Sequence, residues 1–268
     1  MDSNTFLSGL NQIFASGDQE QVSAYLQNSL SRAEAADDKG AVITILNEMI
    51  GYYRITSRYS LAISAAERVI ALMRELGYDN TVHYGTTLLN AATAYRASGD
   101  NVKALDLYNS VLAIYKRHLP EDDQRLAALY NNLSGIHQDA GEYEKSCDYL
   151  EKSAKILSKI KGAEIDAATV YTNLALAQFE LKREQTAQAN LQIALNLFEG
   201  TAEDGKVDSR NAPHYAGALA GLAGAYFRMK EFGKAVELFK DALSRSTEWY
   251  GENREYAVTR RNCPADYA

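Results

Sequence analysis

The sequence predicts an all-α fold, a solenoid of six helix-turn-helix repeats. One indication is a recurring pattern of apolar and small residues, clearest at 88–114, 129–157, 170–197 and 218–244. Another is the small residue that opens the second helix of each repeat, which we call the anchor. The anchors are Val22, Ala62, Ala104, Ser146, Ala187 and Ala235, spaced by 40, 42, 42, 41 and 48 residues. A period of this size is typical of repeats that stack into one continuous core.

We expect one solenoid domain over residues 1–268. Its repeats are expected at 5–38, 43–78, 85–119, 127–161, 168–199 and 216–250, with a partial seventh at 255–268. A polar connection at 199–213 lengthens the spacing before the sixth repeat. We expect a surface loop there, either a tolerated insertion or a functional segment. The partial seventh repeat either caps the solenoid or leaves an apolar edge through which copies self-associate.

The third repeat shows why each unit should form two helices. Helical spacing relates Leu88, Ala91, Ala92 and Tyr95 in the first helix and Ala104, Leu105, Tyr108, Val111 and Leu112 in the second. Between them, Gly99 can take the positive φ that ends a helix, and Asp100 can cap the next one. In the fifth and sixth repeats this slot holds Lys182 and Lys230. Those turns must therefore form without glycine.

Two further positions in the first helices predict how the helices pack. Ala92, Ala175 and Ala223 lie midway along first helices, where a larger side chain would push two crossing helices apart. Beside that crossing, one position carries Tyr53, Tyr95 and Tyr226, and His137 and Gln178 in two other repeats. We expect the tyrosine rings to fill the core, with their hydroxyls at its rim.

Charge and composition disfavour several classes of partner. The net charge is −7 and no block is rich in Lys or Arg, which disfavours nucleic acid and anionic membranes as partners. No window of 18 residues is apolar, and the N-terminus lacks the pattern of a signal peptide. Cys147 and Cys263 lie far apart, so no disulfide framework is predicted and we expect a cytoplasmic protein.

No catalytic, metal or cofactor site is predicted. The four histidines are dispersed, and no HExxH, glycine-rich phosphate loop or Gly-x-Ser-x-Gly motif occurs. No Cys/His pair has zinc spacing. Cys147, near the start of a second helix, is interpreted as a small packing residue. We therefore expect a protein that is not an enzyme.

The repeats resemble the tetratricopeptide repeat over about residues 5–246. The resemblance rests on the small–small–aromatic pattern of the first helices, the Gly-Asp turn, and an Ala–aromatic–Ala pattern in the second helices, cleanest at Ala235, Phe239 and Ala242. The period near 42 and the Asn131-Asn132-Leu133 triplet are similar to the long variant found in kinesin light chains and many bacterial proteins. This resemblance implies a right-handed solenoid that binds ligands in a concave groove lined by its first helices.

The positions that line this groove in the family can be matched to positions of this sequence, and the matching residues are the candidate partner-binding residues. They are Asn47, Arg54, Asn90, Arg96, Asn131, Asn132, Asn173, Leu176, Phe179 and Phe227. Asn90, Asn132 and Asn173 recur at one position, so stacked repeats would align them as a ladder able to pair with the backbone of an extended peptide. The alternative is that each amide bonds to its neighbour's backbone or to water.

The groove is also graded along the chain. Arg54 and Arg96 share a position that is later held by Gln138, Phe179 and Phe227. A groove with cations at one end and aromatic rings at the other would suit an acidic segment followed by an apolar one. The alternative is that these are solvated surface residues that happen to differ.

The sequence therefore predicts an interaction module that binds a peptide or a helix of a partner protein. Two other classes remain open. One is a regulatory sensor whose solenoid pitch changes when a small peptide binds. The other is a structural subunit that self-assembles through its C-terminal edge.

Overall fold

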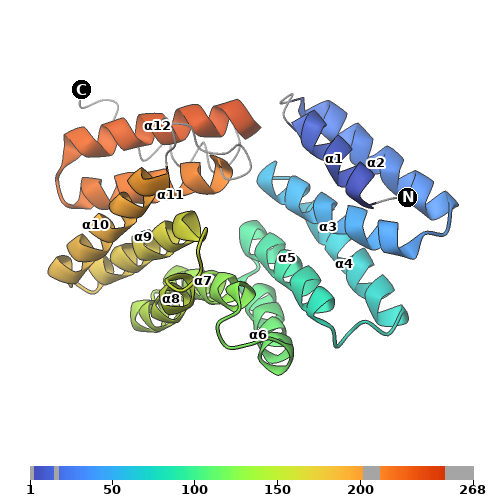
Figure 1. The fold of residues 1–268 in the computed structure, drawn as a ribbon, viewed down its shortest axis with the longest axis horizontal. Helices are drawn as coiled ribbons and strands as arrows, with labels where there is room; N and C mark the ends of the chain where they lie inside the picture. The colour runs from blue at the N-terminus through green and yellow to red at the C-terminus, as the bar shows by residue number, and fades with distance from the viewer. Residues whose placement is uncertain (1–2, 15–17, 202–211, 251–268) are drawn as a thin grey trace. The chain divides into compact units, whose positions relative to one another are not determined.

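The structure, a computed structural model, describes residues 3–14, 18–201 and 212–250. These residues form twelve α-helices and no strand (Figure 1). The predicted all-α solenoid of helix-turn-helix repeats is therefore confirmed. The predicted partial seventh repeat and its C-terminal edge lie outside the described residues, as does most of the 199–213 connection.

Consecutive helices pair into six repeats, each with a first and a second helix. Their bounds are α1 Ser3–Phe14, α2 Gln19–Ala35, α3 Lys39–Ile55, α4 Tyr59–Glu75, α5 Val82–Ser98, α6 Asn101–His118, α7 Gln124–Asp139, α8 Tyr143–Leu157, α9 Glu164–Glu180, α10 Glu184–Thr201, α11 Ala212–Arg228 and α12 Phe232–Tyr250.

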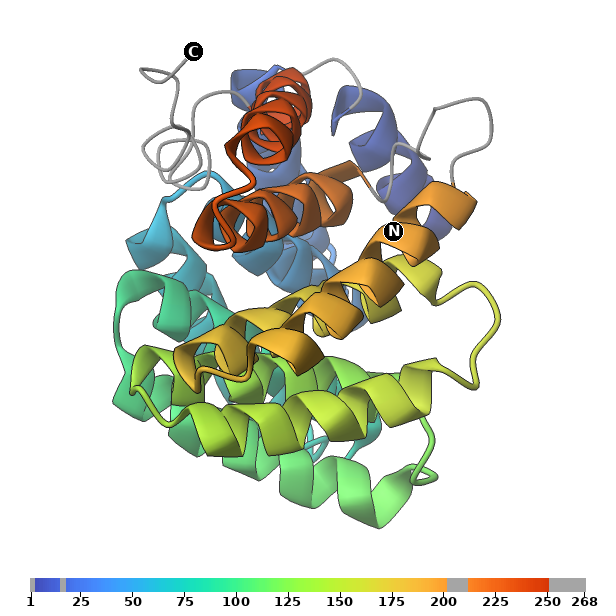
Figure 2. The same cartoon turned by 90° about the vertical axis from the view of Figure 1, so that its left-hand side faces the viewer.

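The helices fall into two compact units. Unit 1 is Met1–Pro120 and contains α1 to α6, and unit 2 is Glu121–Ala268 and contains α7 to α12. Within a unit, the two helices of a repeat pack on each other, as α11 and α12 do in Figure 2. First helices of neighbouring repeats also meet, α3 against α5 and α9 against α11. Each unit thus has its own stack of helix pairs.

The first helices begin two to four residues before the expected repeat starts. Polar caps explain the extra residues in unit 1: Asp38 accepts a hydrogen bond from the backbone N–H of Ala41, and Thr81 from that of Tyr84. The 199–213 connection is also shorter than expected, because α10 runs to Thr201 and α11 begins at Ala212. Pro213 fits the first turn of α11, where no helical partner is needed for its missing N–H.

The turns inside the repeats form as predicted, with and without glycine. Gly99 has a φ of 94° and Asp100 caps α6 through the backbone N–H of Lys103. Lys182 and Lys230 adopt the same left-handed region, with φ of 59° and 63°. In the Lys182 turn, the N–H of Arg183 donates to the carbonyl of Gln178 at 2.9 Å. Backbone hydrogen bonds of this kind hold the turn in a conformation that costs lysine about 1–2 kcal/mol.

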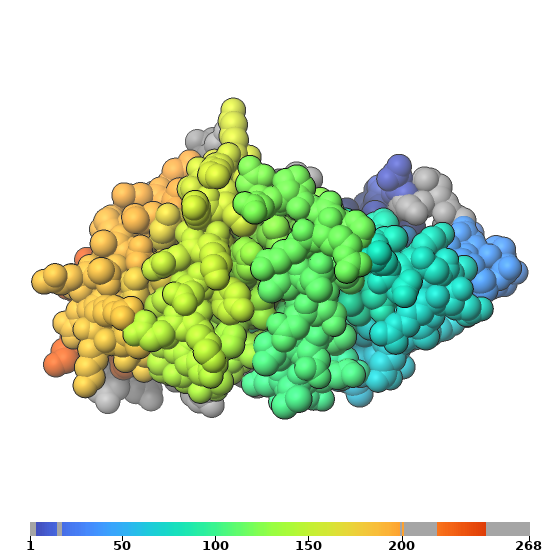
Figure 3. Space-filling view, turned by 90° about the horizontal axis from the view of Figure 1, so that it is seen from below, coloured from blue at the N-terminus to red at the C-terminus, as the bar shows by residue number. Residues whose placement is uncertain are grey.

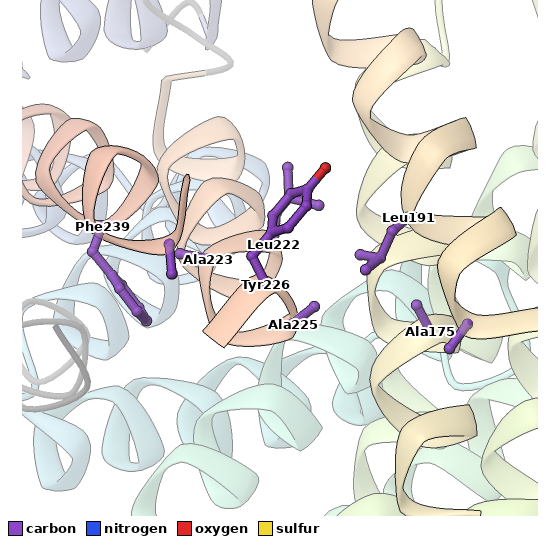
Figure 4. Close-up of a cluster of buried hydrophobic side chains, with 9 residues drawn as sticks. Ala175, Leu191, Leu222, Ala223, Ala225, Tyr226 and Phe239 are labelled. Atoms are coloured by element: carbon purple, nitrogen blue, oxygen red, sulfur yellow. The ribbon is translucent and has the colours of Figure 1, made fainter. Parts of the chain in front are cut away.

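The predicted helix crossings are alanine-lined and buried. Ala92, Ala175 and Ala223 are fully buried. In unit 2, Ala175 and Ala223 belong to one apolar cluster with Leu191, Leu222 and Phe239 (Figure 4). Burial of each such large side chain contributes about 1.5–3 kcal/mol. The tyrosines of the neighbouring position, Tyr53, Tyr95 and Tyr226, are buried as expected.

At Gly85, α5 lies close to side chains of α6. A Cβ atom at Gly85 would lie 2.7 Å from Cε1 of Tyr115 and 3.3 Å from Cγ2 of Ile114. The Tyr115 ring is fully buried, and its hydroxyl is 3.0 Å from the Thr86 hydroxyl. The ring therefore has little freedom to move away from a methyl group.

We expect Gly85→Ala to lower the free energy of unfolding by about 1–3 kcal/mol, the usual cost of overpacking. The measurement is urea unfolding followed by circular dichroism. Gly51→Ala is the matched control, because Gly51 also lies inside a first helix but a Cβ there would meet nothing within 4 Å. The control should be neutral or stabilising, since alanine is the better helix former. Equal destabilisation by both substitutions would contradict the close contact at Gly85.

Candidate interaction surface

The candidate partner-binding residues all lie on first helices, as expected. Asn47 and Arg54 are on α3, Asn90 and Arg96 on α5, Asn131 and Asn132 on α7, Asn173, Leu176 and Phe179 on α9, and Phe227 on α11. Phe227 is 41% exposed and the others are half-buried. Those of unit 1 and those of unit 2 form two separate sets.

In unit 1, the asparagines of neighbouring first helices bind each other. The Asn90 side-chain N–H donates to Oδ1 of Asn47 at 3.1 Å. The Asn47 side-chain N–H in turn donates to the carbonyl of Ile43, one helical turn earlier, at 3.0 Å. This pair joins α3 to α5 and orients the Asn47 amide.

Unit 2 repeats the arrangement between α7 and α9. The Asn173 side-chain N–H donates to Oδ1 of Asn131 at 3.0 Å. The Gln138 side-chain N–H donates to the Asn173 carbonyl at 3.4 Å and to the Ser146 hydroxyl at 3.1 Å. Asn132, the residue that aligns with Asn173 in sequence, makes no side-chain hydrogen bond within the described part of the chain.

In both pairs, the two asparagines lie at positions that differ by one residue when the repeats are aligned at their anchors. Aligning the repeats in sequence did not predict this offset. In each pair, the later asparagine, Asn90 or Asn173, lies fourteen residues before the anchor of its own repeat. The earlier asparagine, Asn47 or Asn131, lies fifteen residues before the anchor of the preceding repeat. Thr172 and Gly221 occupy the same offset positions, and a Cβ at Gly221 would lie 3.1 Å from Cγ2 of Thr172. The offset thus reflects the stagger of neighbouring first helices. Each paired amide keeps further hydrogen-bonding capacity.

On α3, a carboxyl group takes the place that asparagine has in later repeats. Glu48 lies fourteen residues before its anchor, as Asn90, Asn132 and Asn173 do. It is half-buried, and burial raises the pKa of its carboxyl group. Its charged form is therefore disfavoured in the folded protein.

The position eight residues before each anchor changes character between the units. In unit 1 it carries the arginines Arg54 and Arg96. In unit 2 it carries Gln138, Phe179, which packs against the apolar cluster of Figure 4, and Phe227. The Phe227 ring meets the ring of Phe232 edge to face, with centroids 5.4 Å apart. The unit 1 position is thus cationic, and the later unit 2 positions are aromatic.

The described residues outside this surface contain little reactive chemistry. Within them, no group of three His, Cys, Asp or Glu residues could hold a metal ion, and no helix has the length and apolar character needed to cross a bilayer. Cys147 is buried, and burial raises the pKa of its thiol to about 11. The thiol is therefore protonated at neutral pH, which fits the packing role expected for it.

The Asn131–Asn173 pair should contribute to stability. We expect Asn173→Ala to lower the free energy of unfolding by about 1 kcal/mol, the usual net value of one hydrogen bond. The measurement is a double-mutant cycle with Asn131→Ala in urea, where the double variant should lose less than the sum of the two single variants. Asn132→Ala is the matched control and should change stability little. Additive losses at Asn131 and Asn173 would contradict the pairing.

Glu48→Gln should stabilise the protein at neutral pH. Because the folded-state pKa of Glu48 is raised, the folded state binds its proton more tightly than the unfolded state does. The carboxylate therefore costs stability above the folded pKa, and that cost disappears as pH falls to the unfolded value of about 4.3. Thermal unfolding should show a higher Tm for the variant at pH 7 and a smaller difference at pH 4. Glu237→Gln, at an exposed site on α12, is the control. A pH-independent difference would contradict the assignment.

Comparison with known proteins agrees with this architecture. Residues 41–117, 125–200 and 216–254 match the tetratricopeptide repeat family. A curated relative, the RxLR effector protein SFI4 of Phytophthora infestans, is 21% identical over 221 residues, which are 82% of this chain and 63% of the relative. The chain spans about two thirds of the length of the curated relatives that it matches first.

Solved structures share the fold at low sequence identity. The nearly identical repeats of a kinesin light chain from Podosopora anserina align with a TM-score of 0.56 and 19% identity, covering 82% of this chain and 97% of that one. NprR in complex with its cognate peptide NprX aligns with a TM-score of 0.68 and 13% identity, covering 97% of this chain and 73% of that one. With its period near 42 residues and its paired helices, this chain shares the fold of the kinesin-light-chain repeats and belongs to the tetratricopeptide repeat family.

Proposed function

We propose that the protein is a non-enzymatic interaction scaffold whose first helices bind a peptide or a helix of a partner protein. The observation that carries this proposal is the position eight residues before each anchor. Its side chains stay at the surface, and they carry paired cations in unit 1 and paired aromatic rings in unit 2. Apart from Phe179, which packs against the apolar cluster, the side chains at this position do not belong to the buried core and are free to differ.

Unit 1 offers a cationic site. Arg54 and Arg96 lie at equivalent positions on α3 and α5, which contact each other. A guanidinium group can bind a carboxylate through two parallel hydrogen bonds. The neighbouring Asn47 and Asn90 amides keep donors and acceptors for a peptide backbone. Because the whole chain carries a net charge of −7, these cations are a local feature that favours an acidic segment.

Unit 2 offers an apolar site. Phe179 and Phe227 lie at equivalent positions on α9 and α11, which also contact each other. Phe227 is exposed, whereas Phe179 is half-buried against the apolar cluster. Partly exposed aromatic rings backed by a packed core are typical anchors of protein interfaces. On α7, the Asn132 amide is bound to no other described residue, so it remains available to a peptide backbone. These features favour an apolar segment of a partner on unit 2.

The comparisons support this proposal at the level of the fold. The solved NprR complex holds a peptide, NprX, on a scaffold of the same architecture. A stack of rigid helix pairs also lowers the conformational cost of binding, because the surface is ordered before the partner arrives.

The test of the unit 1 site uses a fluorescein-labelled peptide that contains four acidic residues. We expect Arg54→Glu with Arg96→Glu to raise its Kd about tenfold or more, measured by fluorescence anisotropy at low salt. The control is Lys103→Glu, which matches each single arginine substitution in charge and lies at an exposed site in the first turn of α6, where an acidic residue suits the helix. If the double variant and the control bind the peptide with equal Kd, the proposal for unit 1 is wrong.

The apolar segment has its own test. A second labelled peptide of four apolar residues, two of them aromatic, is used here, and Phe227→Ser should raise its Kd. Urea unfolding of the variant measures separately what the lost ring contact with Phe232 costs in stability. Val102→Ser is the control, since Val102 is a still more exposed apolar residue on a second helix. A peptide whose affinity responds equally to both substitutions does not use the first-helix surface of unit 2.

A further inference from the structure

A pocket in unit 2 lies where other repeats are filled by a tyrosine ring. It has a volume of about 440 Å³ and is lined by residues of α8, α9 and α10, among them Glu151, Ala154, Gln178 and Asn190. A volume of this size falls within the usual range of small-ligand sites. In the space-filling view, α8 in yellow-green and α10 in gold occupy one face of unit 2 (Figure 3). We call this cavity the Gln178 pocket.

The residue at the base of the pocket replaces an aromatic ring. Gln178 lies nine residues before its anchor, where Tyr53 and Tyr95 lie in the second and third repeats. Both tyrosines are buried and occupy the core beside the preceding second helix. Gln178 is 7% exposed, and its Oε1 accepts a hydrogen bond from the Asn190 side chain on α10 at 2.8 Å. The shorter side chain is held by α10, so it does not fill the volume of a ring.

A second residue that lines the Gln178 pocket also has a smaller side chain than its counterparts in other repeats. Ala154 on α8 lies eight residues after its anchor. Four other second helices are also followed by a further repeat, and at this position they carry larger side chains. These are Leu30, Ile70, Leu112 and Leu195. Ala154 and Gln178 line one pocket. Two independent replacements by smaller side chains therefore coincide in space.

The fifth repeat lacks the tyrosine hydroxyl at this position but retains a carboxylate that could accept its hydrogen bond. In unit 1, the Tyr95 hydroxyl donates to Oε1 of Glu67 at 3.0 Å. Glu67 lies five residues after its anchor, and Glu151 lies at the same position on α8. Glu151 lines the pocket, and its carboxylate forms no hydrogen bond or ion pair with any residue that the structure describes. The fifth repeat thus lacks the ring but keeps a carboxylate in the place of its partner.

We propose that the Gln178 pocket binds the tyrosine side chain of a partner protein. The ring packs against Ala154 and Leu174, and its hydroxyl donates to the Glu151 carboxylate, as Tyr95 does to Glu67 within the chain. Burial of an aromatic ring removes a large apolar area from water, while the hydroxyl finds an acceptor at the rim. The site adds a second contact to the proposed scaffold function and does not use Arg54, Arg96 or Phe227.

The expected selectivity follows from Glu151. A phenylalanine side chain fills the pocket but leaves the carboxylate without its hydrogen bond. A phosphotyrosine brings a charge of about −1.5 to −2 against the Glu151 carboxylate. We expect the order tyrosine, then phenylalanine, then phosphotyrosine. Lys155 also lines the pocket, so tighter binding of phosphotyrosine would show that the cation sets the preference and would overturn the assignment to Glu151.

The test titrates N-acetyl-L-tyrosinamide into the full-length chain labelled with nitrogen-15. Shifts of the Gln178 and Asn190 side-chain amide signals report binding in the pocket. Gln178→Tyr fills the pocket with the chain's own ring and restores the residue that three other repeats carry, so it should fold. We expect this variant to bind the probe about tenfold more weakly or not at all. Gln192→Tyr, the same change at an exposed site of α10, is the control and should bind as the unsubstituted chain does.

A second pair of measurements separates the hydroxyl from the ring. The unsubstituted chain should prefer N-acetyl-L-tyrosinamide over N-acetyl-L-phenylalaninamide by about fivefold, and Glu151→Ala should abolish that preference. Unchanged binding in Gln178→Tyr, or shifts that avoid Gln178 and Asn190, would overturn the proposal. The Arg54→Glu/Arg96→Glu variant should bind the probe normally, so failure here and failure of the first-helix proposal are distinguished.

Discussion

The close crossing of first and second helices is the constraint on which the rest of the structure depends. Fully buried alanines at Ala92, Ala175 and Ala223 let two helix axes approach, and no larger side chain fits there without separating them. The position beside the crossing then faces the core, and a tyrosine ring fills it in three repeats. The positions farther around each first helix are then released from packing. These surface positions carry the differences between unit 1 and unit 2.

Periodicity and turn chemistry were sufficient to predict the helices, their pairing and the buried alanines. The sequence also placed turns without glycine at Lys182 and Lys230, because the chain must reverse at the same place in every repeat. The left-handed conformation of these two lysines is seen only in the structure. The predicted starts of the first helices were late, since the apolar pattern begins only after the capped first turn. Asp38 and Thr81 carry the capping signal that would have placed two of those starts correctly.

The pairing of the asparagines could not be predicted in the same way. An alignment compares residues at equal distances from an anchor, and it therefore grouped Asn90, Asn132 and Asn173. Neighbouring helices are staggered, so the contacts join positions fourteen and fifteen residues before successive anchors. The Gln178 pocket was missed for a related reason. The sequence shows that Gln178 departs from tyrosine, but Ala154 lies in another repeat, and only the folded chain brings the two residues together.

The staggered asparagine pairs also restrict how the repeats can be rearranged. Asn131 of the fourth repeat matches Asn173 of the fifth, whereas Thr172 of the fifth matches Gly221 of the sixth. If the fifth repeat were removed by recombination, Asn131 would meet a glycine and lose its amide partner. If it were duplicated, Thr172 would meet an asparagine in place of the glycine that now makes room for it. These two junctions are therefore specific for the repeat that follows, and the fifth repeat is not interchangeable with its neighbours.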